Sequence, residues 1–286
     1  MSCYENNNLK WNSLLKKKKT PVFYTGLINI KYSDLKNKIG NNNVEYQDNL
    51  IEELYNGKII QFTDAISQND INFIIEEAKK ISKNNSSTNT KCVQGVQNFF
   101  YLQLQDHSKE GGYKTLDRSH YFFPWNIDSK LIFEKINKYW SLIKILGGQH
   151  PDKYNDHLPS DGIINRIHVI QYLTGGGTIS AHNDPYEYQR IQVGSVLNDF
   201  GKDFKQGGFA VFNENKQKVC LEPKIQKGSL ICFFPSLIHL VNPIDPERKL
   251  DAKSDNGRWY LSLASVGSEH KIDRKKSVAQ NLETQK

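Results

Sequence analysis

The stretch that decides the fold is IINRIHVIQYLTGGGTISAHNDPYEYQRIQVGSVL, residues 163–197. It begins and ends in runs rich in β-branched residues, and three consecutive glycines at 175–177 give a turn signal between them. Further short runs of this kind follow, separated by Asn-Asp, Lys-Gly and Asp-Asn-Gly turns, at intervals typical of an antiparallel sandwich or barrel. The predicted strands are 163–173, 191–197, 209–212, 219–221, 229–234 and 258–266.

Upstream of this part the pattern becomes helical. Apolar residues recur at helical spacing over about 68–82, behind a cap from Ser67 and Asp70, and over about 129–146, which ends at two glycines. Aromatic runs at 99–102 and 120–123 predict strands, and the first 60 residues contain one plausible strand at 22–30. Because helices do not alternate with the strands, a Rossmann sheet is excluded and an α+β fold is expected.

The 286 residues are enough for one large domain. We interpret the chain as a single domain with four parts. These are a basic N-terminal extension (1–60), a helical and β support region (61–159), a catalytic β core (160–268) and a basic polar tail (269–286).

The net charge of +7 raises the question of nucleic-acid binding. The excess lies mainly at the ends: residues 1–60 contain nine bases and six acids, 61–270 contain 24 and 23, and 271–286 contain five and two. The bases are 32 Lys and six Arg, although phosphate and base recognition favours the forked guanidinium. These observations argue against nucleic acid as the main partner.

The four cysteines form no Cys-x-x-Cys pair, and no apolar signal segment follows the first methionine. No segment approaches the roughly 20 apolar residues that cross a bilayer. We therefore expect a reducing, cytoplasmic location and no membrane partner. The oligomeric state stays open.

The string SAHNDP, residues 180–185, carries the candidate chemistry. In extended backbone, residues two apart face the same side, so His182 and Asp184 can reach one metal ion. His239 ends an apolar run 55 residues after Asp184 and can supply a third ligand. Two imidazoles and one carboxylate leave positions open, as non-haem Fe(II) oxygenases require, whereas structural zinc prefers a closed tetrahedron.

The motifs around this triad, in their order, resemble the 2-oxoglutarate/Fe(II) dioxygenases, most of all the prolyl-4-hydroxylase-type branch. The similarity covers residues 163–267. It is carried by Tyr172, Gly175-Gly176-Gly177, His182-Asn183-Asp184, Leu197-Asn198, Gly207-Gly208-Phe209, Lys227-Gly228, His239 and Gly257-Arg258-Trp259-Tyr260-Leu261-Ser262. The resemblance implies a double-stranded β-helix core, a jelly roll of the cupin-like type, braced by N-terminal helices.

The resemblance further implies that His182, Asp184 and His239 bind Fe(II), with 2-oxoglutarate and O2 as co-substrates. The implied reaction hydroxylates an unactivated C–H bond and releases succinate and CO2. Asp184 favours hydroxylation, because related halogenases leave this position vacant for chloride, while desaturation and cyclisation stay open. Related nucleic-acid demethylases carry a second arginine where this chain has Ala264, which also argues against a nucleic-acid substrate.

The resemblance assigns Arg258 to the distal carboxylate of 2-oxoglutarate, with Ser262 and Tyr172 donating hydrogen bonds to the co-substrate. Independently, Arg258, Tyr260 and Ser262 share strand parity, so a guanidinium and hydroxyl groups face one side, as capture of a carboxylate requires.

One departure from the family concerns spacing. Arg258 lies 19 positions after the distal histidine, further than in most family members. The intervening residues 245–256 are polar and rich in turn residues, which is typical of a surface loop. Arg248 and Lys249 in this loop are rivals for the carboxylate role, although neither begins a strand pattern.

Residues beside the metal ligands are the candidates for substrate binding. Tyr186, Tyr188 and Arg190 follow the His-x-Asp motif, and Arg166 and His168 share strand parity with the co-substrate tyrosine. Because two arginines can clamp a carboxylate, we expect a small, anionic, amino-acid- or peptide-like metabolite. The alternative is that both arginines are structural ion-pair partners.

Two other functions stay open. One is a protein or peptide hydroxylase of the prolyl type, with residues 99–125 as one wall of an extended groove. The other is a catalytically inactive jelly-roll binding protein that has kept the fold.

Overall fold

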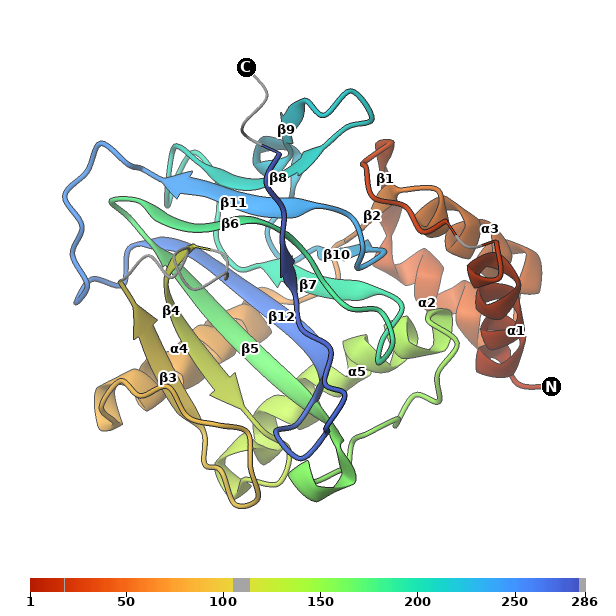
Figure 1. Cartoon of the computed structure of the whole chain (residues 1–286), viewed down its shortest axis with the longest axis horizontal. Helices are drawn as coiled ribbons and strands as arrows, with labels where there is room; N and C mark the ends of the chain where they lie inside the picture. The colour runs from red at the N-terminus through yellow and green to blue at the C-terminus, as the bar shows by residue number, and fades with distance from the viewer. Residues whose placement is uncertain (18, 105–113, 283–286) are drawn as a thin grey trace.

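A computed structural model describes residues 1–17, 19–104 and 114–282 (Figure 1). Its helices and strands are, in chain order, α1 (Cys3–Leu15), β1 (Gly26–Lys31), α2 (Tyr32–Gly40), α3 (Val44–Tyr55), β2 (Lys58–Thr63), α4 (Gln68–Asn84), β3 (Phe99–Gln103), β4 (Thr115–Phe122), α5 (Lys130–Leu146), β5 (Ile163–Leu173), β6 (Gly177–Asn183), β7 (Gln192–Val196), β8 (Gly208–Phe212), β9 (Lys218–Cys220), β10 (Leu230–Phe233), β11 (His239–Ile244), β12 (Gly257–Gly267) and β13 (Val278–Ala279).

The eight strands β5 to β12 form two facing layers. One layer has the order β10-β7-β12-β5 and the other β6-β11-β8-β9. Apart from the β8-β9 hairpin, each successive strand changes layer, which is the winding of a jelly roll. The predicted antiparallel sandwich is thereby confirmed as a double-stranded β-helix. The strands β6 and β11, absent from the predicted set, complete the second layer.

Strand β4 joins the two layers. Its residues 118–122 pair with β5, and its first residues, Thr115 and Leu116, pair with β6. Beyond β10, the first layer is extended by β2 and β1, which run parallel to each other.

The sides of β12 alternate strictly. Trp259, Leu261 and Leu263 belong to the large apolar cluster beneath the helices, whereas Arg258 and Ser262 line a cavity between the two layers. The helices therefore cover the outer face of the first layer and leave its inner face for a site (Figure 1).

The predicted helices and aromatic strands are confirmed as α4, α5, β3 and β4. Residues 1–60 form three helices, β1 and the start of β2, and they join the main core, in which Trp11, Leu35 and Leu54 are fully buried. None of the helices described is long and apolar enough to cross a membrane.

The buried carboxylate of Asp70 clamps α4 to α5. Its oxygens accept hydrogen bonds from the Tyr139 hydroxyl (2.8 Å) and from the Nζ atoms of Lys138 (2.8 Å) and Lys135 (3.2 Å). Burial alone would raise the pKa of Asp70, but these bonds outweigh it and lower the pKa to about 2. The carboxylate form is therefore stabilised by folding.

Replacing Asp70 with Asn is expected to lower the free energy of unfolding at pH 7 by about 1–2 kcal/mol, since both lysines are partly solvated. Because the pKa is depressed on folding, this difference is present above the ordinary carboxyl pKa and disappears as the pH falls from about 4 to 2. Urea denaturation at pH 7 and pH 3 measures it. The exposed Asp128→Asn is the control, and equal losses in both variants at pH 7 would contradict the clamp.

Candidate metal centre

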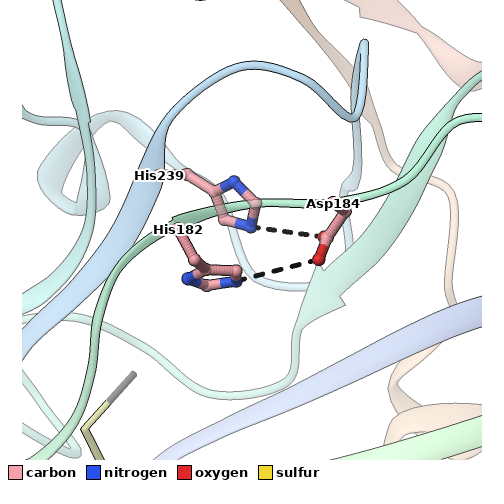
Figure 2. A group of neighbouring side chains, drawn as sticks. All are labelled: His182, Asp184 and His239. Carbon is pink, nitrogen blue, oxygen red and sulfur yellow. Dashed lines mark ion pairs between the residues drawn. The ribbon is translucent and has the colours of Figure 1, made fainter. Parts of the chain in front are cut away.

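Two neighbouring strands of the second layer bring the predicted triad together. His182 is the penultimate residue of β6, and it lies opposite His239, the first residue of the antiparallel β11. Asp184 follows the end of β6, where its backbone N–H donates to the carbonyl of Pro235 (2.9 Å). Figure 2 shows the three side chains converging on one point.

The separations between the ligand atoms suit a single ion. Asp184 Oδ2 lies 3.6 Å from His239 Nε2, and Asp184 Oδ1 lies 4.0 Å from His182 Nε2. Two atoms bound to one ion at about 2.1 Å each can lie at most ~4.2 Å apart. All three ligand atoms lie within 4.8 Å of one another, so little closure is needed around an ion.

The outer nitrogens of both imidazoles are fixed by the backbone. His182 Nδ1 lies 2.8 Å from the carbonyl oxygen of Ser180, and His239 Nδ1 lies 2.9 Å from that of Leu237. A carbonyl can only accept, so each Nδ1 carries the proton and each Nε2 presents its lone pair to the site, as metal-binding histidines do. Burial, and then the proximity of His182, lowers the pKa of His239 to about 4, which keeps this ring neutral.

A cavity of about 450 Å³ contains the triad on one side and the inner face of β5 and β12 on the other. Strands β12 and β5 form its floor. In their register Arg258 lies opposite Tyr172, Ser262 opposite His168, and Ala264 opposite Arg166. Side chains from all of these residues line the cavity. The side chains that were predicted to share one face of each strand therefore do face the cavity.

Arg258 is 1% exposed and is held by a carboxylate that the sequence did not indicate. Its Nε donates to Glu222 Oε1 (2.8 Å), while Glu222 Oε2 accepts from the backbone N–H of Phe209 (2.6 Å). Burial alone would lower the pKa of Arg258, but Glu222 outweighs this and raises it. Its buried Nη1 has no hydrogen-bond partner among the residues described, so it can still bind a carboxylate.

The opposite end of the floor also presents unsatisfied polar atoms. The buried Arg166 Nε and His168 Nε2 have no hydrogen-bond partner within the described part of the chain. The imidazole of His168 stacks on Tyr121 at 4.3 Å, and the Arg166 guanidinium lies 5.0 Å from the same ring. Burial, and then the charge of Arg166, holds the pKa of His168 well below its usual value, so this ring is neutral.

The other predicted substrate residues do not line the cavity. Arg190 donates to the side chains of Asn8 and Asn12 on α1, which makes it a structural tie to the N-terminal helix. Tyr186 packs against Phe234 with ring centroids 5.2 Å apart. The Tyr188 hydroxyl accepts a hydrogen bond from the backbone N–H of Lys275 (3.2 Å).

The rivals of Arg258 lie on the surface. The side chain of Arg248 is 61% exposed and faces Asp245, and Lys249 is exposed. The possible peptide wall, residues 99–125, includes residues 105–113, which lie outside the described part. Of the remainder, Tyr121 lies directly opposite His168 on the neighbouring strand and contacts both Arg166 and His168 from the side.

Two polar residues at the site had no sequence signal. Glu222 follows a short strand in a Glu-Pro turn, and Ser277 lies in the basic tail, yet its hydroxyl donates to Asp184 Oδ1 (2.5 Å). Both contacts join segments far apart in the chain, by 36 and 93 positions respectively. Neither follows from strand periodicity or from motif spacing.

No family model matches the chain, and no curated protein sequence matches it. Among solved structures, the chain is similar to a prolyl-4-hydroxylase from Pseudomonas putida, with 13% identity, 76% of this chain and 97% of that chain covered, and a TM-score of 0.48. It is also similar to a full-length Neurospora crassa protein in complex with α-ketoglutarate and thymine, with 11% identity, 85% of each chain covered and a TM-score of 0.44. A third similar structure is a prolyl hydroxylase from Trichoplax adhaerens in complex with a hypoxia inducible factor peptide. The identity is 13%, the alignment covers 82% of this chain and 93% of that chain, and the TM-score is 0.47.

At these identities the similarity concerns the fold, which the strand pairing of the chain already defines. The chain is a double-stranded β-helix protein of the α+β class, with a His-Asp-His group between its layers that could hold a metal ion.

Proposed function

We propose that the chain is an Fe(II)- and 2-oxoglutarate-dependent oxygenase that hydroxylates an unactivated C–H bond of a small, anionic, amino-acid- or peptide-like metabolite, releasing succinate and CO2. One observation carries the proposal: a single cavity contains both the His182–Asp184–His239 triad and the buried Arg258, whose Nη1 has no partner among the described residues. Two imidazoles and one carboxylate are the donor set of non-haem Fe(II) oxygenases.

Different residues of the cavity bind the metal and the co-substrate. His182, Asp184 and His239 hold the iron, and bound iron with 2-oxoglutarate and O2 supplies the oxidising power for the hydroxylation. Arg258 binds the distal carboxylate of 2-oxoglutarate, and the nearby hydroxyls of Ser262 and Tyr172 hydrogen-bond to the co-substrate. Ser262 and Tyr172 are 7% and 4% exposed, so these polar contacts form in a site largely closed to water, where they are strongest.

The second cationic end of the cavity supports an anionic substrate. Arg166 lies opposite Ala264, six residues along β12 from Arg258, which corresponds to ~20 Å of strand. A substrate anion at Arg166 would thus not compete with 2-oxoglutarate at Arg258. The neutral His168 next to it offers a hydrogen bond, and together they would hold a reactive carbon near the metal between the two ends.

A reducing, cytoplasmic location forms part of the proposal. All four cysteines are free thiols, and Cys232 is fully buried. Disulfides are rare in compartments kept reducing by thiols, and this supports the assignment.

Anaerobic titration of the whole chain with Fe(II) and 2-oxoglutarate tests the proposal. We expect a weak metal-to-ligand charge-transfer band in the visible region, followed by succinate release when O2 is added. Absence of both the band and succinate would leave a jelly-roll binding protein as the function. Stimulated succinate release from a panel of anionic metabolites and of peptides then identifies the substrate class, and stimulation by peptides alone would favour the peptide hydroxylase.

Replacing Arg166 with Gln is expected to raise KM for the anionic substrate by about 10–100-fold, the effect of losing a hydrogen bond to a charged group. Succinate formed without substrate should stay at the parent level, because Arg258 and the triad are intact. The matched control is Arg190→Gln, which removes the other arginine near the motif and is expected to leave KM unchanged. An equal rise in both variants would remove Arg166 from the substrate site.

A further inference from the structure

The C-terminal residues 274–282, here called the strap, pass from the lining of the cavity to the edge of β6. In Figure 1 the strap is the dark blue segment that crosses in front of β6 and β11. Residues Arg274 to Ser277 line the cavity, and β13 then adds to the edge of β6, with Val278 opposite Asn183 and Ala279 opposite His182. The strap therefore pairs directly with the strand that carries a predicted metal ligand.

Besides the β13–β6 pairing and the Ser277 bond, polar contacts of its ends hold the strap: Arg274 pairs with Glu269, and the Gln280 side chain donates to Asn183 Oδ1 (3.3 Å). The backbone N–H of Gln280 donates to the carbonyl of Ala181 (2.9 Å), that of Lys275 donates to the Tyr188 hydroxyl (3.2 Å), and Leu282 packs partly against an apolar cluster. Strand β13 has only two residues, and Val278 is 58% exposed. Because it buries little apolar surface, the strap contributes little to the core.

The two oxygens of the Asp184 carboxylate have different partners, because Ser277 binds one of them. Its hydroxyl donates to Oδ1 (2.5 Å), and Oδ2 faces His239 Nε2 (3.6 Å). The terminal torsion of an aspartate is broad and nearly two-fold, so backbone position alone does not fix the direction of its oxygens. The hydrogen bond from Ser277 supplies this missing constraint.

We propose that Ser277 is a positioning residue for the metal centre, and that docking of the strap is thereby coupled to metal binding. The inference rests on the proposed function, because it requires that Asp184 binds a metal. Since coupling between two events is reciprocal, a bound metal also holds the strap against β6. The tail predicted as a basic polar segment is then part of the site.

Metal affinity of the whole chain, measured with Co(II) by its visible absorption, tests the proposal. Ser277→Ala is expected to weaken Co(II) binding by about 10–100-fold, as is typical for residues that orient a ligand. Ser277→Thr keeps the hydroxyl and is expected to restore affinity. Val278→Thr changes the exposed neighbour, which points away from the site, and is expected to bind Co(II) like the parent.

Hydrogen exchange at the Gln280 backbone amide is a second measurement. If Ser277 had only a structural role, Ser277→Ala would not alter the effect of Co(II) on this exchange rate. Co(II) is expected to slow this exchange in the parent and in Ser277→Thr, and to slow it less in Ser277→Ala. Equal Co(II) affinity and equal protection in Ser277→Ala and the parent would overturn the proposal. A parent chain that binds no Co(II) would instead overturn the proposed function.

Discussion

Replacement of His182 with alanine is expected to abolish metal binding and, with it, all 2-oxoglutarate turnover. The residue supplies one of only three protein ligands in the proposed centre. Loss of a residue that merely orients a ligand already costs about 10–100-fold in affinity, so loss of a ligand itself is expected to cost more than ~100-fold. Iron content after dialysis, together with succinate formation, measures the effect.

Far-ultraviolet circular dichroism should show that His182→Ala keeps its fold. The Nδ1 atom bonds to the local carbonyl of Ser180, and the core clusters do not include this histidine. His150→Ala is the matched control, because the His150 side chain is 52% exposed and lies outside the cavity. Retention of one equivalent of iron by His182→Ala would show that the triad is wrongly assigned.

Replacement of Arg258 with methionine is expected to weaken 2-oxoglutarate binding by at least ~30-fold, since truncating one member of a buried charged pair costs about 2–5 kcal/mol. Isothermal titration of the iron-loaded chain measures the dissociation constant. Unchanged affinity would move the carboxylate role to Arg248 or Lys249.

The same substitution leaves Glu222 buried without its cation, so the free energy of unfolding should also fall by about 3–5 kcal/mol. The double variant Arg258→Met/Glu222→Gln separates the two effects. Glutamine still offers an oxygen to the Phe209 N–H, so stability is expected to recover in part. Co-substrate affinity is not expected to recover, and its recovery would show that Arg258 acts only on folding.

His182 and Asp184 were predictable because their determinants are local, whereas His239, 55 residues after Asp184, follows from the ordered motifs of the family resemblance. His182 and Asp184 are two residues apart at the end of one strand, and His239 begins the next strand of the same layer. Strand parity likewise placed Arg258 and Ser262 on the cavity side of β12. Except for His239, a period of two, applied over a few residues, decides the direction of these side chains.

The remaining parts depend on contacts that no short window contains. Helix α1 has a weak apolar pattern and buries Asn7, Trp11 and Leu14, so its tertiary packing rather than its periodicity makes it part of the core. Arg190 looked like a substrate residue because it follows the metal motif, but its partners Asn8 and Asn12 lie far earlier in the chain, at separations of 182 and 178 positions. Glu222 and Ser277 escaped prediction for the same reason.

The parallel pair β1 and β2 has a consequence for how the chain is made. Strand β2 pairs on its free side with β10, and the Gln61 side chain accepts from the backbone of Gln226 across 165 positions of sequence. At a synthesis rate of about 5–20 residues per second, β2 emerges ~10–30 s before that partner exists. On the nascent chain, the edge of β2 that pairs with β10 therefore stays unpaired for longer than many small domains need to fold. We expect a chaperone that recognises unpaired strand edges to bind β2 during this interval.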